Sequence, residues 1–223
     1  MTRLLLLLSG AGSNLQAIID AIEAGRLPAT LVAVISNRAT ALGLKRAEQH
    51  GIATQVLDHR DYPDRASFDA ALAAAIDNYQ PDWILLAGFM RILTPQFVAH
   101  FRDRLLNVHP SLLPAYPGLD THRRVLAAGE AEHGATIHLV TEDLDAGPTL
   151  LQGRFAIEPG EDVATLEAKV HTLEHQLYPT AVALLASGQL RIVAGKIFYL
   201  GQPVPAEGLQ WSQALGRVTP RCP

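Results

Sequence analysis

The chain begins with a pattern that few folds accommodate: an apolar strand, a glycine-rich turn and an amphipathic helix in immediate succession. After Arg3, residues 4–8 are all leucine, which is typical of a strand buried on both faces. The turn Ser9–Asn14 follows, and apolar residues then recur at helical spacing as far as Ala24. Strand, tight turn and helix are the first half of a βαβ unit, so this start predicts a parallel sheet.

The rest of the chain repeats the alternation. We expect strands at 31–35, 53–57, 83–87, 105–109, 135–140 and 149–156, and helices at 41–50, 66–79, 121–128 and 162–187. This order predicts an α/β protein, a single Rossmann-like domain with a mostly parallel central sheet flanked by helices. We expect the domain to cover residues 1–200, with a strand pair inside 191–200. Residues 201–223, which lack periodicity, are expected to form a loosely ordered tail.

Composition excludes several classes of protein. The net charge of −4, with both signs dispersed, gives no basic surface for a nucleic-acid partner. No apolar run approaches the ~18 residues that a membrane span needs. The single cysteine, Cys222, rules out a disulfide framework and suits a reducing compartment. We therefore expect a cytoplasmic protein without membrane partners, a monomer or a homodimer, that acts on small molecules.

The strand at 105–109 ends in polar side chains that share one face. Asn107 and His109 alternate along the strand and so point to the same side, and Pro110 then ends it. An asparagine offers neutral N–H donors, and a histidine offers a proton near neutral pH. The pair could therefore stabilise an oxygen that becomes negative when a carbonyl is attacked. The alternative is an ordinary strand end with a capping asparagine and a surface histidine.

A turn rich in carboxylates follows the strand at 135–140. Asp145, directly before a Gly-Pro turn, is the carboxylate best placed to keep His109 protonated. Glu142 and Asp143 fit better as solvated turn residues. From the residues alone, Asp145 could also be a plain turn aspartate.

The first turn, Ser9–Asn14, suits an anion. Gly12 lets a phosphate approach the exposed N–H groups of the helix, and Ser13 and Asn14 can add donors. A dinucleotide fingerprint would need a glycine where Leu15 stands and a carboxylate at the end of the second strand. The turn therefore favours a phosphate monoester, although an NADP site using Arg38, or a turn needed only for packing, stays open.

Two further stretches suggest binding sites. Met90, Arg91, Ile92 and Leu93 follow the strand at 83–87 at its carboxyl end, where open α/β sheets bind ligands. Their backbone groups could pair with a flat heteroaromatic ring in an apolar pocket; the alternative is a hydrophobic turn.

The second stretch, His171-Thr-Leu-Glu174-His175, has the spacing of a zinc-peptidase helix. A catalytic zinc needs a third protein ligand, and no carboxylate follows until Glu207, so we expect no metal site. Glu174 facing a cleft to bind a polar substrate is more plausible, and a solvated helix face is the alternative.

Five stretches, in this order along the chain, resemble a known family: Ser9–Ala17, Ala87–Leu93, Leu106–Pro114, Tyr116–Gly118 and Asp145–Pro148. Together they resemble the phosphoribosylglycinamide formyltransferases, folate-dependent enzymes of de novo purine synthesis. The likeness extends over nearly the whole chain, to about residue 200. The combination is highly specific, although the Asn-x-His…Asp part alone is shared across folate formyltransferases.

The resemblance implies transfer of a formyl group from N10 of 10-formyltetrahydrofolate, a co-substrate, to the amine of glycinamide ribonucleotide, without a metal. It implies that the N-terminal part of the domain binds phosphate and that the C-terminal part is catalytic and binds folate. Residue by residue, it makes Asn107, His109 and Asp145 catalytic; Gly12, Ser13, Asn14 and Glu174 ribonucleotide-binding; and Arg65, Met90, Arg91, Ile92, Leu93 and Asn107 folate-binding. The chain departs from some members at Asp120, where they have a histidine.

Three other functions compete with formyl transfer to the ribonucleotide. Formyltetrahydrofolate deformylases resemble this domain but pass the formyl group to water, and they carry an N-terminal regulatory domain; here the first strand begins at residue 3. A methionyl-tRNA formyltransferase would add a nucleic-acid-binding domain, which the length and acidic balance disfavour. A non-catalytic folate- or phosphate-binding module would have no need for the paired donors Asn107 and His109.

Overall fold

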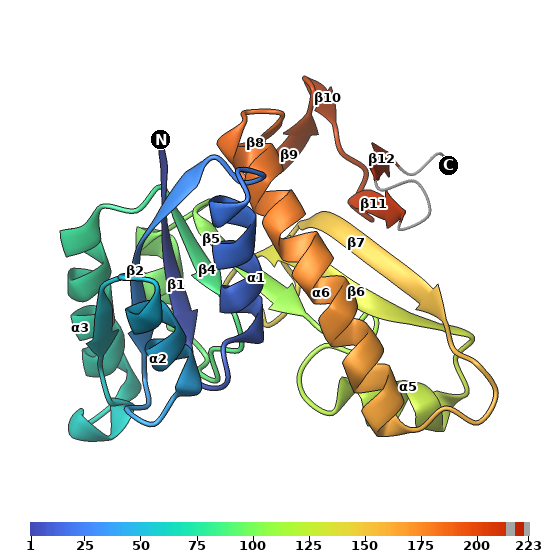
Figure 1. Cartoon of the computed structure of the whole chain (residues 1–223), viewed down its shortest axis with the longest axis horizontal. Helices are drawn as coiled ribbons and strands as arrows, with labels where there is room; N and C mark the ends of the chain where they lie inside the picture. Colours follow the sequence, from blue (N-terminus) through green and yellow to red (C-terminus); the bar gives the residue numbers. More distant parts are fainter. Residues whose placement is uncertain (213–216, 221–223) are drawn as a thin grey trace. The chain divides into compact units, whose positions relative to one another are not determined.

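The computed structural model describes residues 1–212 and 217–220 of the chain. By their internal contacts the residues form two compact units, Met1–Asn107 and Val108–Pro223, where the sequence predicts one domain over 1–200. The boundary falls inside strand β5 (Leu105–His109). The class is confirmed: the protein is α/β, with a mostly parallel central sheet flanked by helices (Figure 1).

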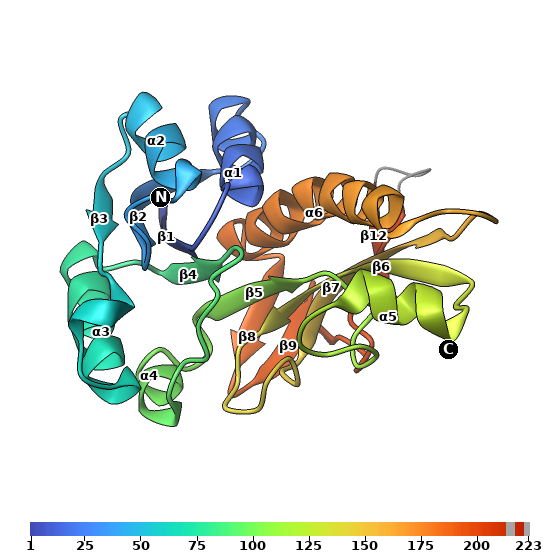
Figure 2. The same ribbon diagram turned by 90° about the horizontal axis from the view of Figure 1, so that it is seen from below.

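The first unit has a parallel sheet in the strand order β5-β4-β1-β2-β3. Its other strands are β1 (Thr2–Leu8), β2 (Ala29–Ser36), β3 (Thr54–Val56) and β4 (Trp83–Leu86). Its helices are α1 (Ser13–Glu23), α2 (Leu42–Gln49), α3 (Arg65–Tyr79) and α4 (Pro95–His100), with a short 3-10 turn η1 (His59–Asp61). Figure 2 shows α1 and α2 on one face of these strands and α3 on the other.

β1 is the central strand of this sheet, and its side chains are buried on both faces. Leu4 to Leu8 are all 0% exposed, because helices cover both faces of a parallel sheet. Helix α4 begins with a side-chain cap: the side chain of Thr94 accepts a hydrogen bond from the backbone N–H of Phe97, and Pro95 occupies the first turn.

The second unit is built around two strands and one long helix. Strands β6 (Glu132–Leu139) and β7 (Thr149–Ala156) are antiparallel, and α6 (Val163–Ala186) lies along both of them. Helix α5 (Thr121–Ala128) packs against α6. The hairpin of β8 (Leu190–Val193) and β9 (Lys196–Tyr199) is the predicted strand pair.

The segment expected to be a loosely ordered tail contributes three strands. β10 (Gln202–Pro203) pairs with β9, and β11 (Leu209–Ser212) pairs in parallel with β7 and antiparallel with β12 (Arg217–Pro220). Leu209 is fully buried there. The segment lacks periodicity because its strands are short and take their partners from distant parts of the chain. Residues 213–216 and 221–223 lie outside the described part.

Candidate active site

Strand β5 presents His109 to two acceptor oxygens. The ring is 5% exposed; Nε2 lies 2.9 Å from the carbonyl oxygen of Tyr116, and Nδ1 lies 3.4 Å from Oδ2 of Asp145. Whichever nitrogen of the ring carries a proton therefore has an acceptor oxygen within reach. Asn107 is half-buried and sits two positions earlier on the same strand.

The carboxylate of Asp145 is fixed by the backbone of a second loop. Its side chain is 8% exposed, and Oδ2 accepts a hydrogen bond of 2.8 Å from the backbone N–H of Gly118. Both residues that face His109 have left-handed backbones, with φ of 57° at Tyr116 and 52° at Asp145. Such conformations cost of order 1–3 kcal/mol in non-glycine residues and cluster at functional sites.

Burial keeps three neighbouring histidines neutral. It lowers the pKa of His138, whose Nε2 lies 3.7 Å from Oδ1 of Asp145, and it lowers the pKa of His122. Burial also lowers the pKa of His133 from 6.5 to about 4. A charge on His109 pushes all three further in the same direction. A charge on His109 and charges on these three rings therefore oppose one another.

The pair of histidines His122 and His133 predicts that the protein loses stability in acid. His122 Nδ1 and His133 Nε2 are 2.9 Å apart and share one hydrogen bond, so one of these two nitrogens carries no proton. The pKa of His133 is about 4 in the folded chain and 6.5 when exposed, so between these pH values the unfolded chain binds more protons. The free energy of unfolding should fall as pH drops from 6.5 towards 4.

Urea unfolding at pH 7.0 and pH 5.0 measures this loss. The control is His133→Phe, which keeps an aromatic ring against Phe155 and removes the titrating group. We expect the variant to lose less stability than the wild type between the two pH values. An equal loss in both proteins would show that His133 does not titrate in this way.

The start of α1 is the helix end that the sequence predicts to bind an anion. Gly12 has a φ of 73°, and no side chain caps the helix, so its first N–H groups have no intrahelical partner. The predicted residues Ser13 and Asn14 form the first turn. The backbone N–H of Gly43 donates to the carbonyl of Gly10 at 3.1 Å, so the start of α2 supports the turn.

Gly43 is a position that the sequence reasoning missed. A Cβ there would lie 2.4 Å from Cδ2 of Leu8 and 3.3 Å from Cα of Gly12. We predict that Gly43→Ala lowers the free energy of unfolding by about 1–3 kcal/mol, because the added methyl group overpacks the core behind the turn. Gly10→Ala is the matched control, since its Cβ would meet nothing within 4 Å. Chemical denaturation of both variants checks this, and equal losses would contradict the steric explanation.

The predicted folate-binding residues belong to the first unit, although the resemblance assigns folate binding to the C-terminal part. Met90 and Ile92 are 58% and 59% exposed, and Leu93 is buried. The guanidinium of Arg91 lies over the ring of Phe68, 5.8 Å from its centre. Arg65 is exposed at the start of α3.

Two other predicted positions lie in the second unit. Glu174 is 5% exposed on α6. Asp120 is exposed at the start of α5 and makes no side-chain cap there.

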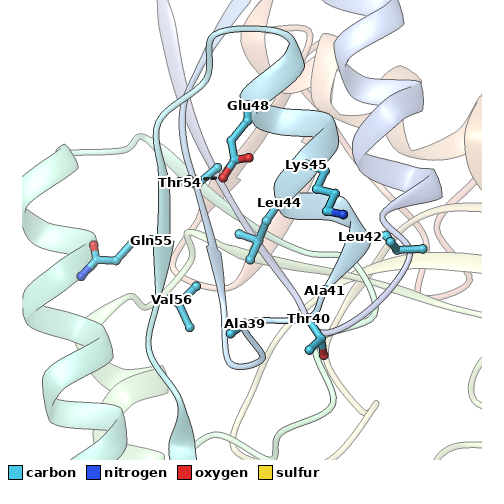
Figure 3. A pocket seen from close by; sticks show the side chains of 10 residues that line it. All are labelled: Ala39, Thr40, Ala41, Leu42, Leu44, Lys45, Glu48, Thr54, Gln55 and Val56. Atoms are coloured by element: carbon cyan, nitrogen blue, oxygen red, sulfur yellow. Dashed lines mark hydrogen bonds between the residues drawn. The ribbon is translucent and has the colours of Figure 1, made fainter.

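A pocket in the second unit reaches the candidate catalytic carboxylate. It holds about 580 Å³, and its wall includes Asp145, Pro148, Phe198 and Pro205. The segment expected to be a loose tail thus lines a cavity beside Asp145. A second pocket, of about 500 Å³, lies along α2 and β3 (Figure 3). It contains none of the residues predicted to bind or react.

The residues that the structure describes contain neither a metal-binding cluster nor a membrane-spanning helix. No group of three or more His, Cys, Asp or Glu side chains in the described part of the chain is arranged to hold a metal ion. The rings of His171 and His175 stack with their centres 6.5 Å apart. No helix among residues 1–212 is long and apolar enough to cross a membrane.

Comparison with known proteins identifies the class of protein to which this fold and these residues belong, the formyl-group transferases. The formyl transferase family model matches residues 2–182. The chain belongs to the formyl transferase family, and the resemblance seen in the sequence is confirmed.

Particular relatives narrow the class. The chain is 47% identical over 205 residues to the phosphoribosylglycinamide formyltransferase of Escherichia coli K12, covering 92% of this chain and 97% of that protein. It is 42% identical over 190 residues, 85% of this chain, to the human trifunctional purine biosynthetic protein adenosine-3, of which it spans only 19%. The solved phosphoribosylglycinamide formyltransferase of Coxiella burnetii superimposes with a TM-score of 0.91 at 48% identity, covering 95% of this chain and 99% of that one.

Proposed function

We propose that this chain transfers the formyl group of 10-formyltetrahydrofolate to the amine of 5'-phosphoribosylglycinamide, a step of de novo purine synthesis. The products are N-formylglycinamide ribonucleotide and tetrahydrofolate. The observation that carries the proposal is the buried ring of His109 with both nitrogens facing acceptor oxygens. The names of the relatives support the choice of acceptor.

The chemistry follows from the donors on β5. The neutral amine attacks the formyl carbon, and the carbonyl oxygen becomes negative in the tetrahedral intermediate. The amide N–H of Asn107 and the imidazolium of His109 stabilise that oxygen, and Asp145 sustains the charge on the ring. As the intermediate collapses, the C–N10 bond breaks, the attacking nitrogen loses a proton and N10 gains one.

We propose separate binding segments for the two substrates. The open N–H groups after Gly12, with Ser13 and Asn14, would hold the phosphate of the ribonucleotide, and Glu174 would bind its glycinamide or ribose part. Arg65 and the segment Met90 to Leu93 would bind the folate, with exposed backbone groups paired to the pterin ring. In this assignment the first unit binds phosphate and part of the folate, and the second carries His109 and Asp145.

We further propose that the enzyme acts in the cytoplasm. The 223 residues contain one cysteine, which suits a reducing compartment where disulfides are rare.

The discriminating experiment measures tetrahydrofolate formation with and without glycinamide ribonucleotide. Formation that depends on the ribonucleotide supports the proposed transfer. Formation in its absence, with release of formate, would identify a deformylase. Binding of both ligands without any turnover would identify a non-catalytic module.

A further inference from the structure

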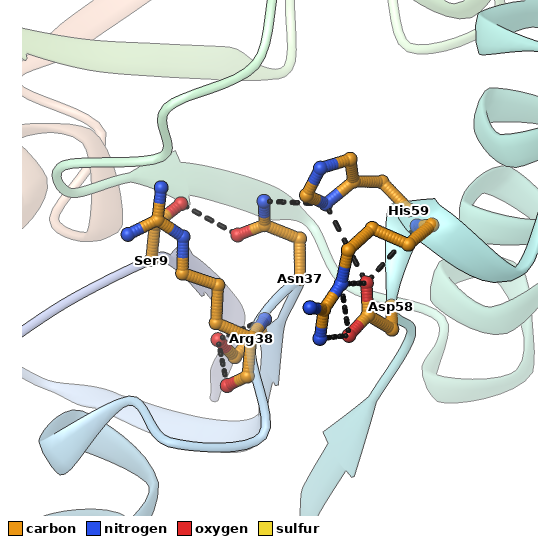
Figure 4. Close-up of polar contacts among 7 residues, drawn as sticks. Ser9, Asn37, Arg38, Asp58 and His59 are labelled. Atoms are coloured by element: carbon orange, nitrogen blue, oxygen red, sulfur yellow. Dashed lines mark hydrogen bonds and ion pairs between the residues drawn. The ribbon is translucent and has the colours of Figure 1, made fainter.

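A network of polar contacts links side chains at the carboxyl ends of three strands in the first unit, β1, β2 and β3 (Figure 4). The hydroxyl of Ser9, after β1, donates to Oδ1 of Asn37, after β2, at 2.6 Å. The amide of Asn37 then meets Nδ1 of His59, after β3, at 3.4 Å. Nδ1 of His59 lies 3.7 Å from Oδ1 of Asp58. Ser9 and Asn37 are 4% and 1% exposed, so the hydrogen bond between them is shielded from water.

Ser9 connects this network of polar contacts to the segment that follows β4. Its backbone N–H donates to the carbonyl of Gly88 at 3.0 Å, and its hydroxyl accepts from the N–H of Met90 at 2.8 Å. One residue therefore holds the backbone on both sides of Phe89. Ser9 is also the first residue of the glycine turn, so the two segments proposed to bind the two substrates are joined through it.

Each side chain in this network of polar contacts is oriented by the neighbour to which it bonds. The hydroxyl of Ser9 donates to Asn37 and accepts from Met90, which leaves the Asn37 NH₂ group facing His59. If Nδ1 of His59 accepts this hydrogen bond, its 3.7 Å approach to Oδ1 of Asp58 is not a hydrogen bond. The ring of His59 packs edge-on against Phe68, with centres 6.4 Å apart, which limits its rotation.

A nucleophilic role for Ser9 does not fit these contacts. The set Ser9, His59 and Asp58 contains the residue types of a hydrolase triad, but a triad needs the imidazole to take the proton of the serine. Here the hydroxyl proton points to the amide oxygen of Asn37, which is no base.

We propose that Ser9, Asn37 and His59 are positioning residues that hold the backbone of Gly88 to Met90 in the geometry that binds the pterin ring. The inference rests on the proposed function, in which Met90 to Leu93 bind the folate. Among the described residues, Asn37 bonds to Ser9 and His59 bonds to Asn37, so both act on that segment through Ser9. Loss of the Ser9 hydroxyl leaves the N–H of Met90 without its buried partner, and loss of the His59 acceptor removes the contact that orients Asn37.

Calorimetric titration with tetrahydrofolate tests this inference in Ser9→Ala, His59→Phe and the double variant. His59→Phe keeps the ring against Phe68 and removes only the acceptor. We expect Ser9→Ala to raise the Kd about tenfold and His59→Phe to raise it about threefold, as for lost buried hydrogen bonds. The double variant should be no weaker than Ser9→Ala alone, because His59 reaches the folate segment only through Ser9.

Ser36→Ala is the matched control. Ser36 is 0% exposed at the same sheet edge, but its hydroxyl bonds only within its own turn, to the backbone of Arg38. Its Kd for tetrahydrofolate should equal that of the wild type.

Three results would overturn the inference. The first is an unchanged Kd in Ser9→Ala. The second is a double variant whose Kd rises by the product of the two single effects. The third is a loss of affinity in Ser36→Ala as large as that in Ser9→Ala. Any of these, with a wild type that binds tetrahydrofolate and transfers formyl, would leave the proposed function intact. A wild type that does neither would remove both.

Discussion

Replacing His109 with asparagine should lower kcat for formyl transfer by roughly 10²–10⁴, with a smaller effect on the KM of either substrate. The ring is buried between Tyr116 and Asp145, so a water molecule cannot take the place of the imidazole as a proton donor. An asparagine can still donate a neutral N–H but cannot carry the charge that stabilises a developing oxyanion. Steady-state kinetics with both substrates varied measures the two parameters.

His138→Asn is the control for this prediction. His138 is a second buried imidazole that faces the same carboxylate, but burial lowers its pKa and its Nδ1 bonds to the carbonyl of Leu139. Its replacement should cost less than tenfold in kcat, because it supplies no charge. If the two variants lose activity equally, the special role of His109 is wrong.

Asp145→Asn should lower kcat by roughly 10²–10⁴ while leaving the fold nearly unchanged. The amide oxygen can still accept the hydrogen bond from the N–H of Gly118, so the loop keeps its 2.8 Å tie. The neutral side chain can no longer sustain a cation at His109, 3.4 Å away. Kinetics combined with thermal unfolding separates the loss of charge from a loss of structure.

Asp143→Asn tests whether position or mere negative charge matters. Asp143 is in the same acidic turn but is exposed. We expect near wild-type kcat for this variant. A wild-type rate in Asp145→Asn, or a loss confined to KM, would show that Asp145 does not support His109.

The strand and helix order could be predicted because periodicity records burial. The run Leu4 to Leu8 predicts a central strand, and these residues are fully buried in β1. The strands after residue 200 could not be predicted: β11 is held by its register with β7, in which Leu209 faces Leu151, and no local pattern encodes that pairing.

The candidate site was predictable where side chains carry the chemistry. The alternation of Asn107 and His109 and the Gly-Pro turn after Asp145 are both visible in the sequence. The partner of His109 Nε2 is a backbone carbonyl, that of Tyr116, and a carbonyl has no residue-type signal.

Other parts of the site depend on contacts between distant residues. Gly43 matters through a close approach to Leu8, and His138 matters through its position beside Asp145. A histidine on an apolar strand, as His138 is, was the one available hint of the latter.

A ¹³C-formyl label on 10-formyltetrahydrofolate gives the most direct test of the central claim, that a charged His109 directs the formyl group to an amine. The label is followed by NMR in the wild type and in His109→Asn, with glycinamide ribonucleotide present. We predict that the wild type delivers all of the label to the formyl amide of the ribonucleotide and that His109→Asn delivers it at least a hundredfold more slowly. Label appearing as free formate, or transferred equally fast by the variant, would contradict the claim.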